Sequence, residues 1–240
     1  MICKVELVMH IHDESSKIKD RYAKRQNHSL YSYRRPEVQY SHSERIRKIV
    51  FFLNKKFPDT NFSDLKCLEI GSGSGHNLLD FIRIGFSPIN LSGIELIAER
   101  DGIAKTLLPV SVKLHCADAI FYDYDHDGYD IVFQSVVFSS LLDNKAQKLL
   151  AEKMWSILRP GGIILWYDFI YNNPANKDVR GVSLNRVREL FPLGKLNYQS
   201  LTLAPPISRL VCSWFPKLYP FLNTFPFLRT HKLIVITKRE

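Results

Sequence analysis

The stretch Cys67-Leu-Glu-Ile-Gly-Ser-Gly-Ser-Gly-His76 decides the fold, because it joins a short apolar strand to a helix through three glycines. The predicted strand covers residues 66–70 and carries an acid, Glu69, just before its end. Glycines at alternate positions (Gly71, Gly73 and Gly75) let the backbone turn sharply and approach a ligand where a side chain would clash. The N–H groups at the start of the following helix can hold an anionic group.

The spacing of this loop is E-x-G-x-G-x-G, which differs from the G-x-G-x-x-G of dinucleotide-binding folds. It is not a phosphate loop either, since no Gly-Lys-Ser/Thr follows. Strands are expected downstream at 90–95, 110–116, 129–133 and 162–167, with helices at 97–108 and 145–158. This alternation predicts an α/β fold with a parallel sheet. An acid after the second strand, Glu95, can accept hydrogen bonds from ribose hydroxyls, and Asp118 after the third can accept from an exocyclic amine such as that of adenine.

In this order and spacing, residues 66–169 resemble class I S-adenosylmethionine-dependent methyltransferases. Residues 69–75 match the cofactor loop of that family, Glu95 its ribose-binding acid, Asp118 its adenine-contacting acid, and Leu158-Arg-Pro-Gly-Gly-Ile163 the turn before strand five. The resemblance implies S-adenosyl-L-methionine as cofactor. It also implies a doubly wound, seven-stranded, mostly parallel sheet whose last strand runs antiparallel beside strand five. The cofactor-binding residues that it implies are Glu69, Gly71, Ser72, Gly73, Gly75, Glu95, Leu96, Asp118, Ala119 and Gln134.

One family position departs from a well-known pattern. After the fourth strand the chain carries Gln134-Ser135, where family members that methylate amino groups of DNA and protein carry Asn/Asp-Pro-Pro-Tyr/Phe. This departure argues against methylation of an exocyclic amine of nucleic acid. Residues 166–174, 203–206 and 228–231 also resemble a bacterial subgroup that is associated with surface-polysaccharide or secondary-metabolite assembly. That resemblance implies O-methylation of a sugar or a small hydroxylated metabolite.

Length and composition are those of one ordinary globular domain, with 240 residues, 45% hydrophobic and 24% charged. The four cysteines show no metal-binding spacing, and Cys67 and Cys116 are expected as small core residues of a protein in the reducing cytoplasm. The acid-rich stretch 123–130 lacks the glycine and glutamate of a calcium loop, so no metal site is expected. The N-terminus is not a signal peptide, because Lys4 and Glu6 interrupt it. No uncharged apolar run approaches eighteen residues.

The net charge of +9 is unevenly distributed. Residues 1–66 carry +6 (14 basic against 8 acidic), residues 67–204 carry −2 (13 against 15), and residues 205–240 carry +5 (6 against 1). Both flanks can lie over the carboxyl ends of the strands, where ligands bind in this kind of fold. The basic rim favours an anionic substrate or an anionic membrane surface, and the alternative is a surface charge that only confers solubility.

The N-terminal flank mixes basic residues and tyrosines over residues 15–40. In the resembled family this segment folds over the cofactor as a lid, where Tyr22, Tyr31 and Tyr40 could pack. The alternatives are a nucleic-acid-binding arm and a plain surface segment. Residues 43–57 are expected to form a helix with Ile46, Ile49, Val50 and Leu53 facing inward.

Two more strands are expected at 196–203 and 233–237, and the long link between them is an insertion. Within it an apolar stripe follows helical spacing (Ile207, Leu210, Val211, Trp214, Phe215 and Leu218). The stripe packs on its own domain or on a dimer mate, or it forms an interfacial helix on a membrane or a lipid-linked substrate. We expect one methyltransferase domain over 1–240, divided into a lid and first helix (1–60), a core (61–203), a helical insertion (204–229) and a last strand (230–240).

The catalytic residues are expected where the last strand starts beside the end of strand five. Asp168 there could orient His231, which could accept a proton from a substrate hydroxyl. Asn172, Asn173 and Arg180 follow in a polar loop and are expected to bind substrate hydroxyls or an anionic group. The predicted function is O-methylation of a sugar, glycan or small metabolite, with the enzyme in the cytoplasm or peripheral to the inner membrane face. An RNA or protein methyltransferase that uses the basic arm and a non-catalytic binding module stay open as alternatives.

Overall fold

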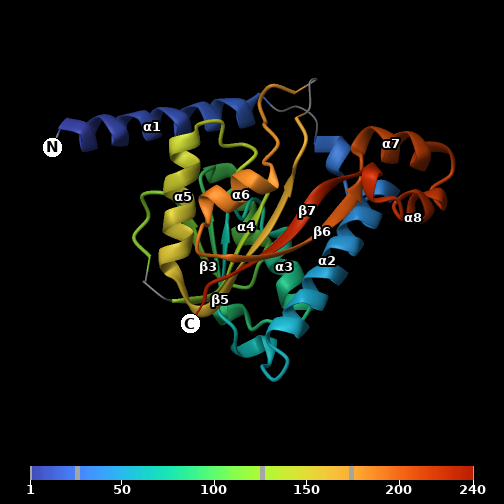
Figure 1. Ribbon diagram of the computed structural model, residues 1–240, viewed down its shortest axis with the longest axis horizontal. Coiled ribbons are helices and arrows are strands. Elements are labelled where there is room, and N and C mark those ends of the chain that lie inside the picture. The colour runs from blue at the N-terminus through green and yellow to red at the C-terminus, as the bar shows by residue number, and fades with distance from the viewer. Residues whose placement is uncertain (1, 25–27, 125–127, 173–175, 240) are drawn as a thin grey trace.

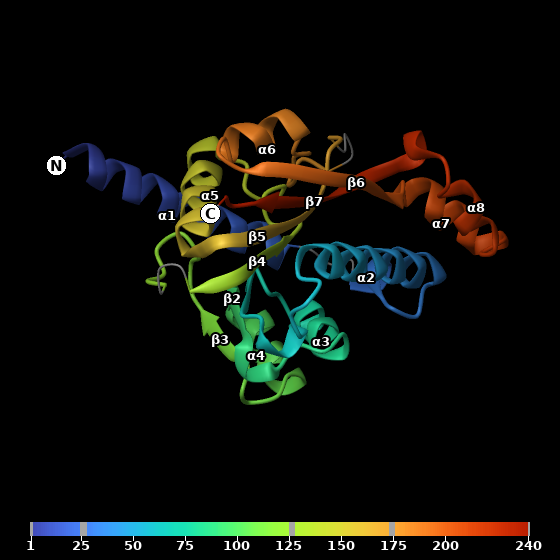
Figure 2. The same ribbon diagram turned by 60° about the horizontal axis from the view of Figure 1, so that its bottom comes forward.

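The computed structural model describes residues 2–24, 28–124, 128–172 and 176–239. Over these residues seven strands form one sheet in the order β3-β2-β1-β4-β5-β7-β6 (Figures 1 and 2). The strands are β1 (Cys67–Ile70), β2 (Leu91–Glu95), β3 (Lys113–Cys116), β4 (Tyr129–Ser135), β5 (Leu158–Phe169), β6 (Lys195–Leu203) and β7 (Arg229–Thr237). The pairs among β1–β5 are parallel, and β7 runs antiparallel to both β5 and β6. The predicted doubly wound sheet is confirmed.

Helices cover both faces of the sheet because β5 and its neighbours are apolar on both sides. The helices are α1 (Ile2–Ala23), α2 (Pro36–Lys56), α3 (His76–Arg83), α4 (Ala98–Leu107), α5 (Asn144–Ile157), α6 (Leu184–Leu190), α7 (Pro205–Trp214) and α8 (Leu218–Leu222). Helices α5 and α6 pack with Ile164 and Trp166 in one apolar cluster. Helices α2, α3 and α4 pack with Leu165 and Tyr167 in a second. Successive residues of β5 therefore face opposite helical layers, as a strand requires.

The N-terminal flank differs from the prediction. Helix α1 was not expected, and α2 begins at Pro36 rather than Ser43. Proline is favoured in the first turn of a helix because its missing N–H needs no partner there. The inward face of α2 is correct at Ile49 and Leu53, which are buried. Cys116 was expected in the core, but it is exposed because β3 is the edge strand of the sheet.

The insertion between the last two strands runs from Ala204 to Leu228, since β7 starts four residues earlier than predicted. It contains α7, α8 and the 3-10 turn Pro226–Leu228, and it lies beyond α2 at the far end of the β6–β7 pair (Figure 2). Leu203, Cys212 and Tyr219 form a small buried cluster under it. In the described part of the chain, no helix combines the length and the apolar character that crossing a membrane requires.

Candidate active site

The glycine loop follows β1 and folds tightly onto β2. All three glycines have a positive φ, and a Cβ at Gly71 would lie 2.5 Å from Val137 Cγ2. A Cβ at Gly73 would lie 2.5 Å from the Arg100 guanidinium, which would have to move, and the positive φ strains a side chain at either position. The N–H groups of Gly71 and Ser72 donate to the Ile94 carbonyl. These two N–H groups therefore bond to β2 and fix the loop against that strand.

Glu69 lies at the bottom of this site with a fully buried carboxyl group. Asn77 on α3 donates to its Oε1 at 2.6 Å, while Oε2 has no hydrogen-bond partner among the described residues. Burial raises the pKa of Glu69 to about 8, and the Asn77 hydrogen bond and the Arg45 charge oppose that rise. A buried acceptor atom without a partner is costly, and it is explained most simply by a ligand that donates to it.

Arg45 on α2 reaches the same site from the opposite side. Its Nη2 donates to Asn77 Oδ1 at 2.8 Å and its Nη1 to Ser135 Oγ at 3.3 Å, and the guanidinium lies 5.0 Å from the Tyr167 ring centroid. Its Nε is buried and has no hydrogen-bond partner among the described residues. A free carboxylate oxygen and a free guanidinium nitrogen in one site match the ammonium and carboxylate of an amino-acid zwitterion.

The acids after β2 and β3 hold the neighbouring loops. Glu95 accepts hydrogen bonds from the N–H groups of Gly73 (2.7 Å) and Ile97 (2.9 Å). Asp118 accepts from the N–H of Ile120 at 2.9 Å and from the Ser15 hydroxyl of α1. Both carboxylates thus lie at the carboxyl edge of the sheet, where the sequence predicts them. Leu96 and Ala119, also predicted as cofactor-binding, are partly buried against the α5-side cluster.

Helix α1 lies over these loops. Besides the Ser15–Asp118 hydrogen bond, Arg21 donates to the Ser140 carbonyl at 2.9 Å, and the Arg100 guanidinium lies 5.2 Å from the Tyr22 ring centroid. Two of the three tyrosines predicted beside the cofactor lie elsewhere. Tyr31 is exposed, and Tyr40 stacks on Tyr219 of the insertion with the ring centroids 4.9 Å apart.

Gln134 shapes the turn after β4. Its Oε1 accepts from the N–H of Val137 at 3.0 Å, and its Nε2 donates to the Tyr167 carbonyl at 3.4 Å. The next turn residue, Val136, has a φ of 55°, a strained value for a β-branched residue. Its N–H donates to the same Tyr167 carbonyl. The turn is thus fixed at the point where the Arg45, Ser135 and Tyr167 side chains meet.

The expected contact between Asp168 and His231 is wrong. The strands are neighbours as predicted, but the register pairs Asp168 with Lys232 and Phe169 with His231. Because side chains alternate along a strand, Asp168 faces the α5 layer and His231 faces the α2 layer. Asp168 accepts hydrogen bonds from the N–H groups of Ser139 and Phe169, and burial raises its pKa to about 7. It holds the turn after β4 and cannot orient the imidazole.

His231 instead lies in an aromatic setting beside Arg45. Its ring stacks on Tyr167 at 5.1 Å between centroids, and its Nδ1 is 3.0 Å from Thr230 Oγ1. Burial, together with the smaller effect of the Arg45 charge, lowers the pKa of His231 to about 4. The imidazole is therefore neutral at physiological pH. Tyr167 in turn shares a 2.7 Å hydrogen bond with Thr202, whose φ of 65° is a second strained position.

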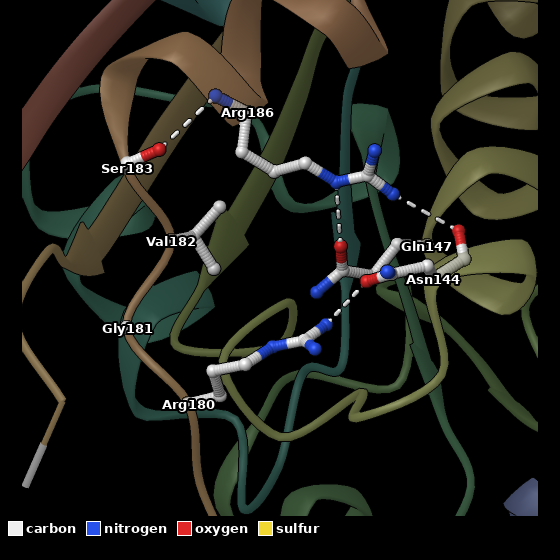
Figure 3. Close-up of a pocket in the computed structure, with 7 residues that line it drawn as sticks. All are labelled: Asn144, Gln147, Arg180, Gly181, Val182, Ser183 and Arg186. Atoms are coloured by element: carbon white, nitrogen blue, oxygen red, sulfur yellow. Dashed lines mark hydrogen bonds between the residues drawn. The ribbon is translucent and has the colours of Figure 1, made fainter.

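The predicted substrate-binding loop follows β5. Asn172 accepts from the N–H of Gly181 at 2.9 Å, and Asn173 lies outside the described residues. Arg180 lines a cavity of about 200 Å³ together with Arg186, and Figure 3 shows both guanidinium groups directed at Asn144 and Gln147 of α5. The hydrogen bonds measure 2.5 Å (Arg180 to Asn144) and 3.1 Å (Arg186 to Gln147). This cavity is on the α5 side, whereas His231 faces α2.

Sequence reasoning missed Arg45, Asn77, Ser135 and Tyr167 as site residues. Arg45 had a detectable signal, because it stands four residues before the buried Ile49 and so shares its inward helix face. A cation on an apolar helix face needs polar partners, and Arg45 finds them in the Asn77 and Ser135 side chains of the site. Asn77 had no such signal, since its role depends on the buried orientation of Glu69.

Comparison with known proteins agrees with this geometry. The family model described as "Methyltransferase domain" matches residues 67–162. No curated protein matches the sequence. Among solved structures, an S-adenosylmethionine-dependent methyltransferase from Archaeoglobus fulgidus is 15% identical, with a TM-score of 0.56, over 80% of this chain and 94% of that one. A methyltransferase from Mesorhizobium loti is 13% identical, with a TM-score of 0.56, over 78% and 96%.

A third structure carries the cofactor. Phosphoethanolamine N-methyltransferase 2 of Haemonchus contortus, in complex with S-adenosyl-L-methionine, is 15% identical, with a TM-score of 0.58, over 79% of this chain and 52% of that one. At these identities the likeness is one of fold. The family match adds chemistry to it, and the orphaned atoms of Glu69 and Arg45 fit the amino-acid end of the cofactor. Residues 67–162 thus match a methyltransferase domain, and the chain shares the fold of S-adenosylmethionine-dependent methyltransferases.

Proposed function

We propose that this methyltransferase transfers the methyl group to a hydroxyl of a sugar, a glycan or a small metabolite. The observation that carries the proposal is His231, a neutral imidazole packed against Tyr167 and Phe169 and close enough to Arg45 to feel its charge. A hydroxyl is a poor nucleophile, so its attack benefits from a nearby proton acceptor. The Gln134-Ser135 sequence after β4 supports the same class, since it lacks the motif of amino-methylating enzymes.

Different residues of this chain bind different parts of the cofactor. Glu69 and Arg45 bind its amino-acid end, and Glu95 and Asp118 bind its ribose and adenine from the ends of β2 and β3. Helix α1 acts as the lid that excludes water, held by the Ser15–Asp118 and Arg21–Ser140 hydrogen bonds. When bound, S-adenosylmethionine supplies an electrophilic methyl group on a positively charged sulfur.

When an acceptor hydroxyl takes up that methyl group, a ring nitrogen of His231 would accept the hydroxyl proton. The low pKa keeps the imidazole neutral and ready to accept, although it limits the strength of the base. Arg45 favours negative charge on the acceptor oxygen, because it is the cation that lies against the Tyr167–His231 stack.

A methyl-transfer screen tests this proposal. Labelled S-adenosylmethionine is offered with nucleotide sugars, glycans, hydroxylated metabolites, RNA and peptides, and S-adenosylhomocysteine formation is measured. Methyl transfer to a hydroxylated acceptor, at a rate that is lower in His231→Asn than in wild type, would support O-methylation. Transfer to RNA or peptide alone would contradict it.

The second candidate is an RNA or protein methyltransferase, which the basic N-terminal flank favours. Three cations of that flank are engaged in ion pairs, however: Lys17 with Asp13, Arg21 with Glu14 and Arg35 with Glu37. These ion pairs reduce the charge available to a phosphate backbone. RNA binding that weakens steeply with salt would favour this second candidate.

A further inference from the structure

The helical insertion carries an unusual concentration of exposed apolar side chains. Its outer surface exposes seven large ones: Leu210, Trp214, Phe215, Leu218, Phe221, Phe225 and Phe227. Trp214 and Phe227 are 76% and 77% exposed. Four of the six residues of the predicted apolar stripe (Leu210, Trp214, Phe215 and Leu218) are therefore exposed, and the buried side of α7 is formed by Ser208 and Cys212. Exposed apolar patches of this kind mark binding surfaces.

The charge of this surface has one sign. Residues 205–228 contain Arg209 and Lys217 and no acidic residue. Arg47 and Lys48 of α2 line an adjoining cavity of about 480 Å³ together with Tyr219. In the described ranges, no ion pair joins any of these four cations to a carboxylate. The one acid that lines the cavity, Glu44, is buried and accepts the N–H of Thr202 at 3.0 Å.

We propose that α7, α8 and the turn Pro226–Leu228 dock this enzyme on the surface of an anionic phospholipid bilayer. The aromatic side chains insert at the level of the headgroups, and the cations beside them bind lipid phosphates. The cavity that Arg47 and Lys48 line is placed to receive one such phosphate. The insertion is suited to this contact because it projects from the end of the molecule, past α2 (Figures 1 and 2).

Charge complementarity favours a bilayer over a second copy of the chain. A two-fold dimer brings the same patch together on both partners. Such a dimer would place Arg209 and Lys217 against their own counterparts, with no acid in residues 205–228 to pair with them. An anionic bilayer neutralises these cations and covers the aromatic side chains at the same time. The inference stands whether or not the acceptor is a hydroxyl.

The test uses the full chain and vesicles of phosphatidylcholine with or without phosphatidylglycerol. Wild type should sediment with the anionic vesicles, more weakly with phosphatidylcholine alone, and more weakly still as salt rises. Trp214→Ser with Phe227→Ser should weaken binding by roughly tenfold or more, since two inserted aromatic side chains are lost. Lys217→Gln should weaken it by about fivefold. The matched control is Ile89→Ser with Leu193→Ser, which removes side chains that are 64% and 73% exposed outside the insertion. This control should bind like wild type.

Tryptophan fluorescence provides a second readout. Of the three tryptophans, Trp166 is buried and Trp155 is partly buried, so Trp214 is the one that vesicles can reach. Vesicles should shift the emission to shorter wavelength, and Trp214→Phe should abolish the shift. The proposal is overturned if wild type ignores anionic vesicles at low salt, or if the Trp214/Phe227 variant binds as well as wild type. It is also overturned if that variant abolishes only a concentration-dependent dimer seen by sedimentation velocity.

Discussion

Cofactor binding should be coupled to the ionisation of Glu69. In the ligand-free protein burial raises the pKa of this carboxyl to about 8, and its Oε2 atom has no partner among the described residues. The ammonium group of the cofactor can pair only with the ionised form. Binding below pH 8 therefore requires that the proton leave, and Glu69→Gln removes the group that holds it.

The magnitude follows from the pKa. With the pKa of the bound carboxyl below 6, the affinity falls about tenfold for each pH unit below about 8, because a one-unit shift corresponds to 1.36 kcal/mol. Between pH 8 and pH 6 the dissociation constant should thus rise roughly 50-fold, or about 2.3 kcal/mol, because half of the carboxyl is already protonated at pH 8. In Glu69→Gln the affinity should be weak and nearly independent of pH over this range.

Isothermal titration with S-adenosylhomocysteine measures both quantities. Repeating each titration in phosphate and in Tris, which differ in ionisation enthalpy, gives the number of protons released, and this number should approach one at pH 7. Asp168→Asn is the matched control, since Asp168 also has a raised pKa, of about 7, but faces the α5 layer. In Asp168→Asn the affinity should change with pH as steeply as it does in wild type. A wild-type affinity that is flat between pH 6 and pH 8, or a slope that survives in Glu69→Gln, would refute the reasoning.

His231→Asn should lower turnover by roughly 10² to 10⁴ without changing the affinity for S-adenosylhomocysteine, as steady-state kinetics and titration would show. Because the pKa of His231 is near 4, the part of the wild-type turnover that depends on His231 should not change with pH above about pH 5. If that part of the turnover instead fell with a midpoint near pH 6.5, His231 would not be the proposed buried base. Arg45→Ala should weaken cofactor binding by roughly 10- to 100-fold, as expected for a hydrogen bond to a charged group, and Arg45→Lys should restore only part of it; equal binding by all three proteins would exclude the role. Ligand-free Glu69→Gln should melt higher than wild type at pH 8 but hardly differ at pH 4. The raised pKa of Glu69 means that its contribution to stability is present below about 4.5 and is lost as pH rises through 8.

The core of the fold was predictable because its signals are local. Three glycines between an apolar strand and a helix, followed by alternating apolar segments, define the elements from 67 to 169 without any long-range information. Helix α1 gave a weaker signal. It mixes charged and apolar residues with little periodicity, and its contacts come from distant loops, as in the Ser15–Asp118 hydrogen bond. A helix of this kind is stabilised by tertiary contacts, which a sequence pattern does not contain.

The error at Asp168 and His231 has a specific cause. The prediction placed Asp168 at the end of strand five and His231 at the start of the last strand, and it inferred their contact from the topology without the strand register. In the structure β5 extends to Phe169 and β7 starts at Arg229. Both residues are then inside paired strands, and strict alternation sends their side chains to opposite faces. Strand ends are the least certain part of a prediction, and a shift of two residues decides whether two side chains meet.

Helix α2 connects the methyl-transfer site with the surface proposed to dock on lipid. With 3.6 residues per turn, Arg45 and Arg47 point to nearly opposite sides of the helix. Arg45 lies against Tyr167, while Arg47 lines the cavity next to the insertion. Between them Glu44 holds the backbone of Thr202, and the Thr202 hydroxyl bonds to Tyr167, whose ring stacks on His231. An acceptor carried at the lipid surface would therefore be separated from Arg45 by about one helix diameter, on the order of 10 Å. This arrangement favours an acceptor whose hydroxyl extends past α2 from a membrane-bound end. If so, a soluble analogue without that end should be methylated with a raised KM and an unchanged kcat, and the Trp214/Phe227 variant should lose the preference between the two acceptors.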